Sequence, residues 1–315
     1  MKLQSLNTVK SMEKVVVTGA TSMLGLALIE ECLRNDTQAI AIIRKNSKKT
    51  HILPESPLVR VFECDLNGLG EFELGGQGRI DAFYHFAWEA TCGESRDSVS
   101  SHVRNIGYTM DALSLAKRLG ARRFIGAGSQ AEYGRRDHAI SPSEKVDPEN
   151  AYGVSKYAAG RLASIRAAQL GLEFIWARVF SAYGRHDNPN SLIMYCIDCL
   201  LKGVEPILTC CGQLWDYIHC SDAARAFYLI GGKGVDQSVY NIGSGEAKPL
   251  CEYVYTIQET IGAGISVGIG KKEYPPKQVM HLCADIESLR KDTGFEARMM
   301  FEEGIRDTVK WYASH

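Results

Sequence analysis

Short runs of β-branched and other apolar residues alternate with longer stretches of helical periodicity through the first half of the chain. This alternation is typical of βαβ units, in which helices join parallel strands and cover the sheet. The predicted strands are residues 15–17, 39–43, 59–62, 82–85, 123–127 and 174–179, and the predicted helices are residues 24–34, 103–119 and 152–170. We therefore expect an α/β fold with a doubly wound parallel sheet.

The first predicted strand runs into the turn TGATSMLG, residues 18–25, and then into a helix. Unpaired N–H groups and the positive end of the dipole make such a helix N-terminus a site for a dinucleotide pyrophosphate. Gly19 would supply the tight turn and Gly25 the close packing of helix on strand. Ser22 stands where the middle glycine of this fingerprint is usual, and its hydroxyl is expected to donate a hydrogen bond instead. The alternative is a plain strand-turn-helix with two glycines.

Basic residues follow the second predicted strand, where an acidic residue would hold a ribose 2′-hydroxyl. Arg44 and Lys45 stand there, with Lys48 and Lys49 behind them, and such a cluster suits a 2′-phosphate. NADP is therefore preferred over NAD, although basic runs are also common as solvated loop charges. Asp65, after the third strand, is placed to accept from an adenine amino group or to cap a turn.

Charged residues nearly cancel along the 315-residue chain, with 36 Lys and Arg against 37 Asp and Glu. A formal net charge of -1 provides no general field that would gather nucleic acid or anionic lipid. No run of about 20 apolar residues is present to span a membrane. We expect neither a nucleic acid nor a membrane partner, and any anion must be bound by a local group of residues.

Cysteine usage and the N-terminal sequence favour a cytoplasmic location. The 10 Cys are scattered, several of them inside apolar runs, which is typical of reduced thiols. The CxxC pair Cys196 and Cys199 lies in a helical stretch without a second pair, so we expect packing and no metal site. Residues 1–14 have no apolar core of signal-peptide length and are expected to form a frayed leader.

Tyr152 and Lys156 are four residues apart at the start of a predicted helix, which puts both side chains on one face. A neighbouring ammonium favours phenolate and lowers a tyrosine pKa toward the range of a general acid/base. Ser129, at the end of the fifth predicted strand, would meet Tyr152 at the carboxyl edge of the sheet, where ligands of open α/β sheets bind. These three residues are the predicted catalytic group.

Eight motifs in one order resemble the extended short-chain dehydrogenases/reductases of the NAD-dependent epimerase/dehydratase family, over residues 18 to about 312. In order they are TGA…G (residues 18–25), HFA (85–87), NIG (105–107), GSQAEYG (128–134), YGVSK (152–156), RVFSAYG (178–184), DYIH (216–219) and NIGSGE (241–246). The resemblance implies a Rossmann-type sheet and a nicotinamide cofactor. It also implies that Tyr152 exchanges a proton with a sugar oxygen, Lys156 lowers its pKa and holds the nicotinamide ribose, and Ser129 polarises the oxygen.

The residues expected to bind the cofactor follow from these motifs and from the turn. They are Gly19, Thr21, Ser22, Met23, Leu24, Arg44, Asp65, Leu66, Phe86, Ala87, Trp88, Asn105, Tyr152, Lys156 and Val179. The resemblance also implies a homodimer formed through the helices at residues 103–119 and 152–170, with internal packing of these helices as the alternative.

The second half of the chain is less regular. Residues 181–190 resemble a loop, whereas residues 216–242 again resemble a helix followed by a strand. We therefore expect a Rossmann domain of residues 1–180, to which residues 215–245 return, and a smaller, partly interleaved α/β substrate lobe of residues 181–315.

Departures from the family pattern reduce the number of reactions that we expect of this chain. Family 4,6-dehydratases carry an Asp-Glu pair after the Ser or Thr, because elimination of water needs a second acid and base. Gln130 and Ala131 stand at these positions, so dehydration is not expected. Family members that bind sugar nucleotides usually have an arginine directly before Asp-Tyr, which binds the diphosphate; this chain has Trp215 there. Lys277 lies where a second phosphate-binding arginine is common.

Residues expected to contact substrate lie after the fourth and fifth strands and in the second half. They are Trp88, Thr91, Gln130, Glu132, Arg185, Asn190, Trp215 and Lys277. Glu132 stands where an apolar residue is usual, and it would contact substrate, orient Arg135 or Arg136, or form a structural ion pair.

The sequence thus predicts an NAD(P)-dependent epimerase or keto-reductase that transfers a hydride at a carbinol or carbonyl carbon of a nucleotide-activated sugar. The basic cluster at Arg44 favours the reductase, whereas the family resemblance favours the epimerase. Two alternatives remain at this stage: a reductase of a non-sugar carbonyl, and a non-catalytic NADP-sensing module.

Overall fold

A single seven-stranded sheet forms the centre of the molecule in the computed structural model, which describes residues 12–91, 93–262 and 264–314. All neighbouring strands in it are parallel, in the order β10-β6-β5-β4-β1-β2-β3. The strands are β1 (Lys14–Thr18), β2 (Gln38–Ile43), β3 (Val59–Glu63), β4 (Ile80–His85), β5 (Ala121–Ser129), β6 (Glu173–Val179) and β10 (Ser238–Ile242). The predicted α/β class with a doubly wound parallel sheet is confirmed.

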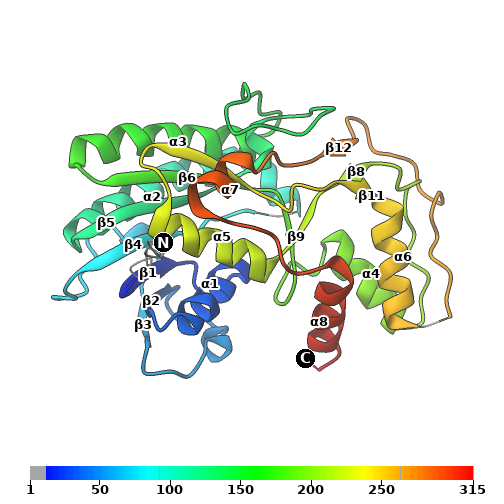
Figure 1. Ribbon diagram of the computed structural model, residues 1–315, viewed down its shortest axis with the longest axis horizontal. Helices are drawn as coiled ribbons and strands as arrows, with labels where there is room; N and C mark the ends of the chain where they lie inside the picture. The colour runs from blue at the N-terminus through cyan, green and yellow to red at the C-terminus, as the bar shows by residue number, and fades with distance from the viewer. Residues whose placement is uncertain (1–11, 92, 263, 315) are drawn as a thin grey trace, which may run out of the picture.

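Helices cover both faces of this sheet. The α-helices are α1 (Met23–Arg34), α2 (Val99–Arg118), α3 (Ala151–Leu170), α4 (Leu192–Leu201), α5 (Cys220–Lys233), α6 (Leu250–Ile261), α7 (Glu287–Thr293) and α8 (Phe301–Ala313). Short 3-10 helices are η1 (Thr50–Ile52), η2 (Leu66–Gly68), η3 (Gly93–Asp97) and η4 (Gln130–Glu132). In Figure 1, α2 and α3 lie together above the sheet and α1 and α5 lie together below it.

The central strand shows why the sheet must be covered on both faces. Val15, Val16 and Val17 of β1 are all fully buried. Val15 and Val17 join the core under α1 and α5, whereas Val16 joins the core under α2 and α3. Side chains of a strand alternate between faces, so a run of consecutive β-branched residues is stable only between two helical layers.

Chain segments after residue 180 return to the sheet. Strand β10 pairs with β6 at one edge, and α5 packs against α1. Residues 181–190, expected to be a loop, begin with β7 (Ser181–Tyr183), which pairs in parallel with β9 (Tyr217–His219). The loop prediction was wrong for these residues because the partner strand lies far along the chain.

The remaining segments form a smaller part beside the sheet, at the right of Figure 1. Helices α4, α6 and α8 share one apolar core there. A three-stranded sheet of β11 (Lys248–Pro249), β8 (Leu214–Trp215) and β12 (His281–Leu282) borders it. Asp216 joins these segments, because its buried carboxylate accepts from the backbone N–H of Ser244 at 2.8 Å and of Ala284 at 3.0 Å.

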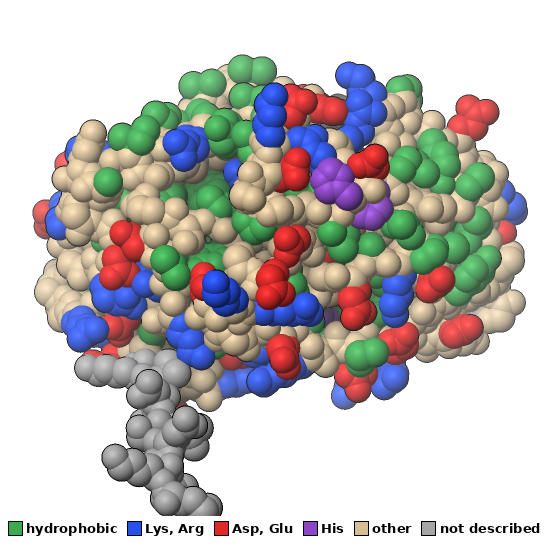
Figure 2. Space-filling model, turned by 45° about the horizontal axis from the view of Figure 1, so that its top comes forward, with side chains coloured by type: hydrophobic (Ala, Val, Ile, Leu, Met, Phe, Trp, Pro, Cys, Tyr) green, Lys and Arg blue, Asp and Glu red, His purple; other side chains and the backbone are tan. Residues whose placement is uncertain are grey.

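Acidic and basic side chains are interspersed over the face seen in Figure 2. Residues 1–11 of the expected leader and Cys92 lie outside the described residues. Met12, in contrast to that expectation, is buried, and its carbonyl accepts from Thr37 Oγ1 at 2.8 Å. Across the described ranges, no helix has both the length and the apolar character needed to cross a membrane.

Three glycines make room for the indole of Trp176 between β5 and α3. A Cβ at Gly126 or Gly128, on β5, would collide with this ring, and a Cβ at Gly160, on α3, would lie 2.7 Å from its Cε2 atom. The indole is buried, and its Nε1–H donates to Glu132 Oε1 at 2.9 Å. The absence of side chains at these positions therefore sets how closely α3 approaches the sheet.

We expect Gly160→Ala to lower the free energy of unfolding by about 1–3 kcal/mol, because the new methyl group overpacks the site of Trp176. The matched control is Gly232→Ala on α5, where an added Cβ meets nothing within 4 Å. That change should leave stability unchanged or raise it by up to about 1 kcal/mol through helix propensity. Urea unfolding measures both, and equal effects would contradict the packing argument.

Candidate active site

A cavity of about 690 Å³ lies at the carboxyl ends of β1, β2 and β4, beside the N-terminus of α1. Its lining includes Thr18, Gly19, Thr21, Ser22, Arg44, Lys49, Asp65, Leu66, Phe86, Ala87, Trp88, Glu89, Thr91 and Tyr108. Gly19 has φ 68°, and a Cβ there would lie 2.7 Å from Ala87 N. Only glycine therefore allows this turn to lie against the end of β4.

Ser22 caps helix α1 at the cavity wall. Its Oγ accepts from Gly25 N at 3.1 Å, so the hydroxyl hydrogen remains available to donate outward. No acidic residue lies in the first turn of α1, and the positive end of its dipole is therefore not offset within the helix. This arrangement can bind an anionic group.

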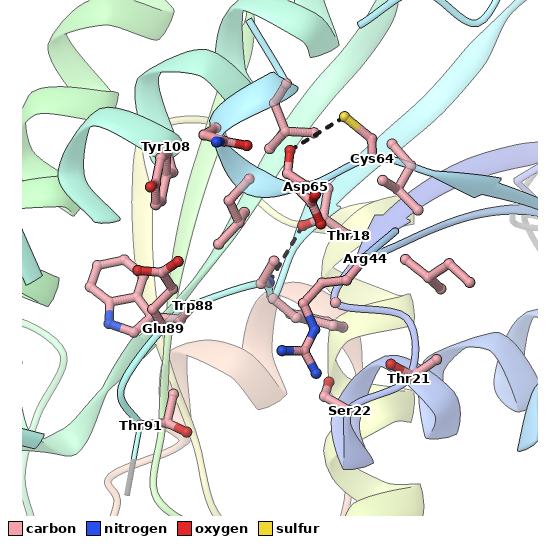
Figure 3. A pocket seen from close by; sticks show the side chains of 18 of the residues that line it. Thr18, Thr21, Ser22, Arg44, Cys64, Asp65, Trp88, Glu89, Thr91 and Tyr108 are labelled. Atoms are coloured by element: carbon pink, nitrogen blue, oxygen red, sulfur yellow. Dashed lines mark hydrogen bonds between the residues drawn. The ribbon is translucent and has the colours of Figure 1, made fainter. Parts of the chain in front are cut away.

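Basic side chains enter the same cavity from the loop after β2. Arg44 and Lys49 both line it, and Figure 3 shows the guanidinium of Arg44 directed toward Ser22. Asp65 Oδ1 accepts from Lys45 N at 3.1 Å, so this carboxylate is partly used to hold the loop that carries Arg44. Its predicted contact with an adenine amino group remains a prediction.

The three predicted catalytic residues come from two elements that pack together. Asn150 caps α3 by accepting from Gly153 N at 2.8 Å, and Gly153 lies so close to Ala131 O that a Cβ would collide with it. This close approach brings Tyr152 to the end of β5, where the neighbouring Ser129 hydroxyl acts to lower the pKa of Tyr152. Lys156 lies one helical turn further along α3.

Lys156 is buried and held on two sides. Its Nζ donates to Ala127 O at 2.7 Å and lies 3.7 Å from the centroid of the Trp88 ring. Burial lowers the pKa of Lys156 to about 7, although the charge of Glu132 opposes this shift. The ammonium is therefore partly deprotonated at neutral pH.

Burial also raises the pKa of Tyr152 above its ordinary value. The charge of Arg96 and the hydrogen bond with Ser129 lower this pKa, and the charge of Glu132 raises it. Because the net shift is upward, the hydroxyl of Tyr152 carries its proton at neutral pH.

Trp88 separates the cavity from the catalytic group. Its ring lines the cavity, contacts Lys156 and lies edge-on to Tyr152 with ring centroids 6.4 Å apart. Ser129, Tyr152 and Lys156, all of them described, do not line the cavity themselves. The indole therefore lies between the cavity and the side chains of Tyr152 and Lys156.

Glu132 is not available to a substrate, in contrast to one of its predicted roles. Its side chain is fully buried, Oε1 accepts from Ser129 N at 2.9 Å, and Oε2 accepts from Arg178 Nε at 2.7 Å. Arg135 and Arg136, its other expected partners, instead pair with Glu149 and Glu144. Of the predicted alternatives, the structure thus shows a structural ion pair.

Several expected cofactor residues lie behind the cavity wall. Asn105 is buried, and its amide group exchanges hydrogen bonds of 3.0 Å with the backbone N–H and carbonyl of Glu89. It therefore orders the loop after β4 and does not line the cavity. Met23, Leu24 and Val179 are half-buried and pack against the core.

The expected substrate residues lie in different places. Trp88 and Thr91 line the cavity, and half-buried Gln130 follows Ser129. Arg185 is bound to Asp307 in a separate hollow between α1, α5 and α8, so the structure does not bring it to the cavity. Further along, Trp215 Nε1 donates to Ser181 Oγ at 2.7 Å, whereas Asn190 and Lys277 are exposed.

Two residues of the site, Arg96 and His102, were not anticipated. Both contact the ring of Tyr152, with the Arg96 guanidinium carbon 4.5 Å from its centroid and the His102 ring centroid 5.7 Å from it. The only available signal in the sequence was their place in and just after the loop that follows β4. Within the described part of the chain, no cluster of His, Cys, Asp and Glu is arranged to hold a metal ion.

Comparison with known proteins matches residues 15–243 to the NAD dependent epimerase/dehydratase family. A dTDP-glucose 4,6-dehydratase of Neisseria meningitidis serogroup B is 26% identical, over 96% of this chain and 93% of that protein. The solved structure of MoeE5 in complex with UDP-glucuronic acid and NAD is 28% identical, with a TM-score of 0.82 over 96% of this chain and 99% of that one.

A UDP-N-acetylglucosamine 4-epimerase from Methanobrevibacter ruminantium M1 shares the fold, with a TM-score of 0.86 and 23% identity over 97% of this chain and 99% of that one. The family match covers the sheet, the cavity and the catalytic group. The chain therefore belongs to the NAD dependent epimerase/dehydratase family and is an enzyme of the extended short-chain dehydrogenase/reductase type.

Proposed function

We propose that this chain is an NAD(P)-dependent epimerase or keto-reductase that acts at a carbinol or carbonyl carbon of a nucleotide-activated sugar, with Tyr152 as general acid/base. The observation that carries the proposal is the meeting of Ser129, Tyr152 and Lys156 at the carboxyl edge of the sheet, beside the cavity at the N-terminus of α1. Ligands of doubly wound sheets bind at this edge.

The residues around the cavity fit a dinucleotide. Gly19 allows the tight turn that leads into the N-terminus of α1, Ser22 offers a hydroxyl hydrogen there, and Arg44 adds a positive charge. When bound, the nicotinamide supplies the acceptor and donor of the hydride. Lys156, whose ammonium lies against the indole of Trp88, would hold the nicotinamide ribose.

Residues of the chain itself would donate and accept the proton that accompanies hydride transfer. Tyr152 is protonated at neutral pH, so its hydroxyl is ready to donate to the oxygen of a carbonyl that is being reduced. The Ser129 hydroxyl would orient the same oxygen by a second hydrogen bond. Donation by Tyr152 serves a keto-reductase, whereas the first step of an epimerase uses its phenolate as base, and the same residue can serve either reaction.

Elimination of water is not part of the proposal, although relatives of this chain are 4,6-dehydratases. Gln130 and Ala131 follow Ser129 and carry no ionisable group. Glu132, the next residue, is buried in its ion pair with Arg178 and faces away from any substrate. No second acid and base is present after Ser129 to protonate a leaving hydroxyl.

We assign substrate binding to the smaller lobe within residues 181–315, with residues 215–245 partly returning to the cofactor domain. Relatives named as nucleotide-sugar enzymes support a nucleotide-activated sugar as substrate. Trp215 and Lys277 are the candidates to bind its nucleotide, in place of the two arginines that the chain lacks. Thr91 and Gln130 are the candidates to bind the sugar.

NADP is the proposed cofactor. Arg44 and Lys49 both line the cavity, and two cations there favour a 2′-phosphate over a free ribose hydroxyl. The similar protein MoeE5 was solved with NAD, so the preference for NADP rests on these two basic residues alone.

We further propose a cytoplasmic homodimer. Helices α2 and α3 pack against each other and expose Val99, Val103, Val154, Leu162 and Ile165 on their outer surfaces. Burial of these apolar side chains against a second copy would be favourable. The described cysteines are free thiols, which favours a reducing compartment.

The function is tested with a panel of UDP-, dTDP-, CDP- and GDP-linked sugars and 4-keto sugars, with NADPH or NADP. We expect turnover of at least one, and we expect Tyr152→Phe to lower kcat by about 10²–10⁴-fold because the proton donor is lost. Tyr157→Phe, one residue beyond Lys156 on the same helix, is the matched control and should retain activity.

Thermal-shift titration with the four nucleoside diphosphates checks the substrate class independently of turnover. A bound nucleotide stabilises the protein by RT ln(1+[L]/Kd), which is about 2.7 kcal/mol at 100 times its Kd. No shift with any of them would contradict the nucleotide-sugar proposal. Full activity of Tyr152→Phe would contradict the catalytic one.

The cofactor proposal predicts that NADPH binds more tightly than NADH and that Arg44→Ala weakens NADPH binding about tenfold or more while leaving NADH binding nearly unchanged. Fluorescence of Trp88 at the cavity wall can follow the titration, with Trp88→Phe to assign the signal. Lys48→Ala removes the same charge from an exposed residue that does not line the cavity. If both variants weakened NADPH binding equally, the cause would be the overall positive charge of the loop and not a contact between Arg44 and the 2′-phosphate.

The dimer proposal predicts a solution mass of twice 34.8 kDa by light scattering. Ile165→Asp on α3 should weaken the dimer at least tenfold, because a two-fold interface would bury the new charge twice. Val204→Asp changes an equally exposed residue in the other lobe and should leave the mass unchanged. A monomeric wild-type protein at micromolar concentration would refute the proposal.

A further inference from the structure

The guanidinium of Arg96 lies on the face of the Tyr152 ring, with its central carbon 4.5 Å from the ring centroid. Arg96 belongs to η3, in the segment between β4 and α2, and η3 packs against α3. A cation over an aromatic face is attracted to the negative π surface. The attraction is stronger for a phenolate ring, which carries a full negative charge, than for a neutral phenol.

His102 fixes the position of Arg96. Its Nε2 lies 2.8 Å from Arg96 O, and because a carbonyl can only accept, Nε2 carries the hydrogen. Its Nδ1 is then free to accept from Trp88 Nε1 at 3.4 Å. His102 is buried and edge-on to Tyr152, so one neutral imidazole links the segment of Arg96, the indole of Trp88 and the tyrosine ring.

Lys156, the cation expected to act on Tyr152, is placed less favourably. Its Nζ lies 5.8 Å from the ring centroid of Tyr152 and donates to Ala127 O at 2.7 Å. The face of Trp88 covers it at 3.7 Å. Arg96 is therefore the nearer cation to the ring, and unlike lysine it stays protonated throughout the accessible pH range.

The Nε–H of Arg96 is buried and has no hydrogen-bond partner among the described residues. An unpaired buried donor is costly, so its presence in a native protein calls for an explanation such as a role in catalysis. Here it lies beside the proposed general acid, where a substrate oxygen would satisfy it.

We propose that Arg96, held by His102, is a further active-site residue that stabilises the phenolate form of Tyr152 through the ring face and offers its free Nε–H to an oxygen of the substrate. The inference rests on the proposed function in taking Tyr152 as the general acid/base. It assigns the electrostatic support of the phenolate mainly to Arg96, while Lys156 serves to bind the cofactor ribose.

Other charged and titratable groups also face Tyr152, and each belongs to a different element. Glu132 of η4 is the opposing charge, Lys156 of α3 lies on the next helical turn, and His102 of α2 is neutral in the tautomer described above. Ser129 of β5 contributes a hydrogen bond. Burial raises the pKa of Tyr152, and among the groups that lower it the charge of Arg96 has the largest effect.

The test measures the Tyr152 pKa directly in the full-length protein without ligand. Tyrosine labelled with ¹³C at Cζ is titrated by NMR, and Tyr152→Phe assigns the resonance. Arg96→Gln removes the charge at similar length, and we expect the pKa of Tyr152 to rise by about 1–3 units. Arg96→Lys should restore part of the shift. Arg166→Gln, an equal charge change on the exposed part of α3, should leave the pKa unchanged.

Kinetics with the substrate found in the panel give a second readout. In the direction that oxidises a sugar hydroxyl, Tyr152 must be deprotonated, so Arg96→Gln should move the acidic limb of the kcat profile to higher pH by the same 1–3 units. Loss of the Nε–H contact should raise KM as well. Arg166→Gln should show neither change.

An unchanged Tyr152 pKa in Arg96→Gln would overturn the inference, as would equal shifts in Arg96→Gln and Arg96→Lys, which would indicate a purely structural role. Neither outcome would affect the proposed function, which depends on Tyr152 itself. Conversely, full activity of Tyr152→Phe would contradict the proposed function. The NMR titration would still decide whether Arg96 lowers the pKa of Tyr152.

Discussion

The buried carboxylate of Glu132 holds together the part of the molecule on which the candidate active site is built. One oxygen accepts from the backbone of Ser129 and the indole of Trp176, and the other accepts from Arg178. These donors belong to β5 and β6, so the carboxylate fixes the ends of two strands relative to each other. Removing one member of such a buried pair leaves the other charge buried without a partner, which lowers the free energy of unfolding by about 3–5 kcal/mol.

Stability alone does not explain why a charge lies there. A buried ion pair is often no more stable than an apolar pair of similar volume. Burial lowers the pKa of Arg178, but the nearby Glu132 and Tyr133 raise it by more, so the guanidinium stays charged and in place on the Tyr133 ring. What the pair provides is position: it holds the backbone N–H of Ser129, whose hydroxyl then meets Tyr152.

The sequence predicts the parts of this structure that depend on local patterns. Short stretches of neighbouring residues are enough to predict the strands of the first half and the turn at Gly19. The same is true of the spacing that puts Tyr152 and Lys156 one helical turn apart. Contacts between segments that are far apart in the sequence produce no such local pattern. The partner of Glu132 lies 46 residues away, and the partner of Arg185 lies 122 residues away. The role of Glu132 was therefore open, and the ion pair of Arg185 with Asp307, in a hollow apart from the cavity, was not foreseen.

Loop geometry determines what two other residues near the site contact. Asn105 belongs to a motif of the family, yet its amide is used to hold the backbone of Glu89. A motif identifies a residue that the fold requires, and it does not distinguish a contact with cofactor from support of a loop. Arg96 shows the reverse case, because no pattern marks it and only the path of the chain after β4 brings it to Tyr152.

Opposing electrostatic effects act on the pKa of Tyr152. Burial favours the neutral forms of both Tyr152 and Lys156, so the free protein is prepared to donate a proton and is poorly prepared to remove one. Oxidation of a sugar hydroxyl requires the phenolate, which needs a cation nearby, whereas reduction of a carbonyl does not. Glu132 opposes the phenolate, and Arg96 and a positively charged oxidised nicotinamide favour it. Tyr152 would therefore act as acid or base according to which of these charges lies beside it, and Arg96 is the cation that the chain itself supplies.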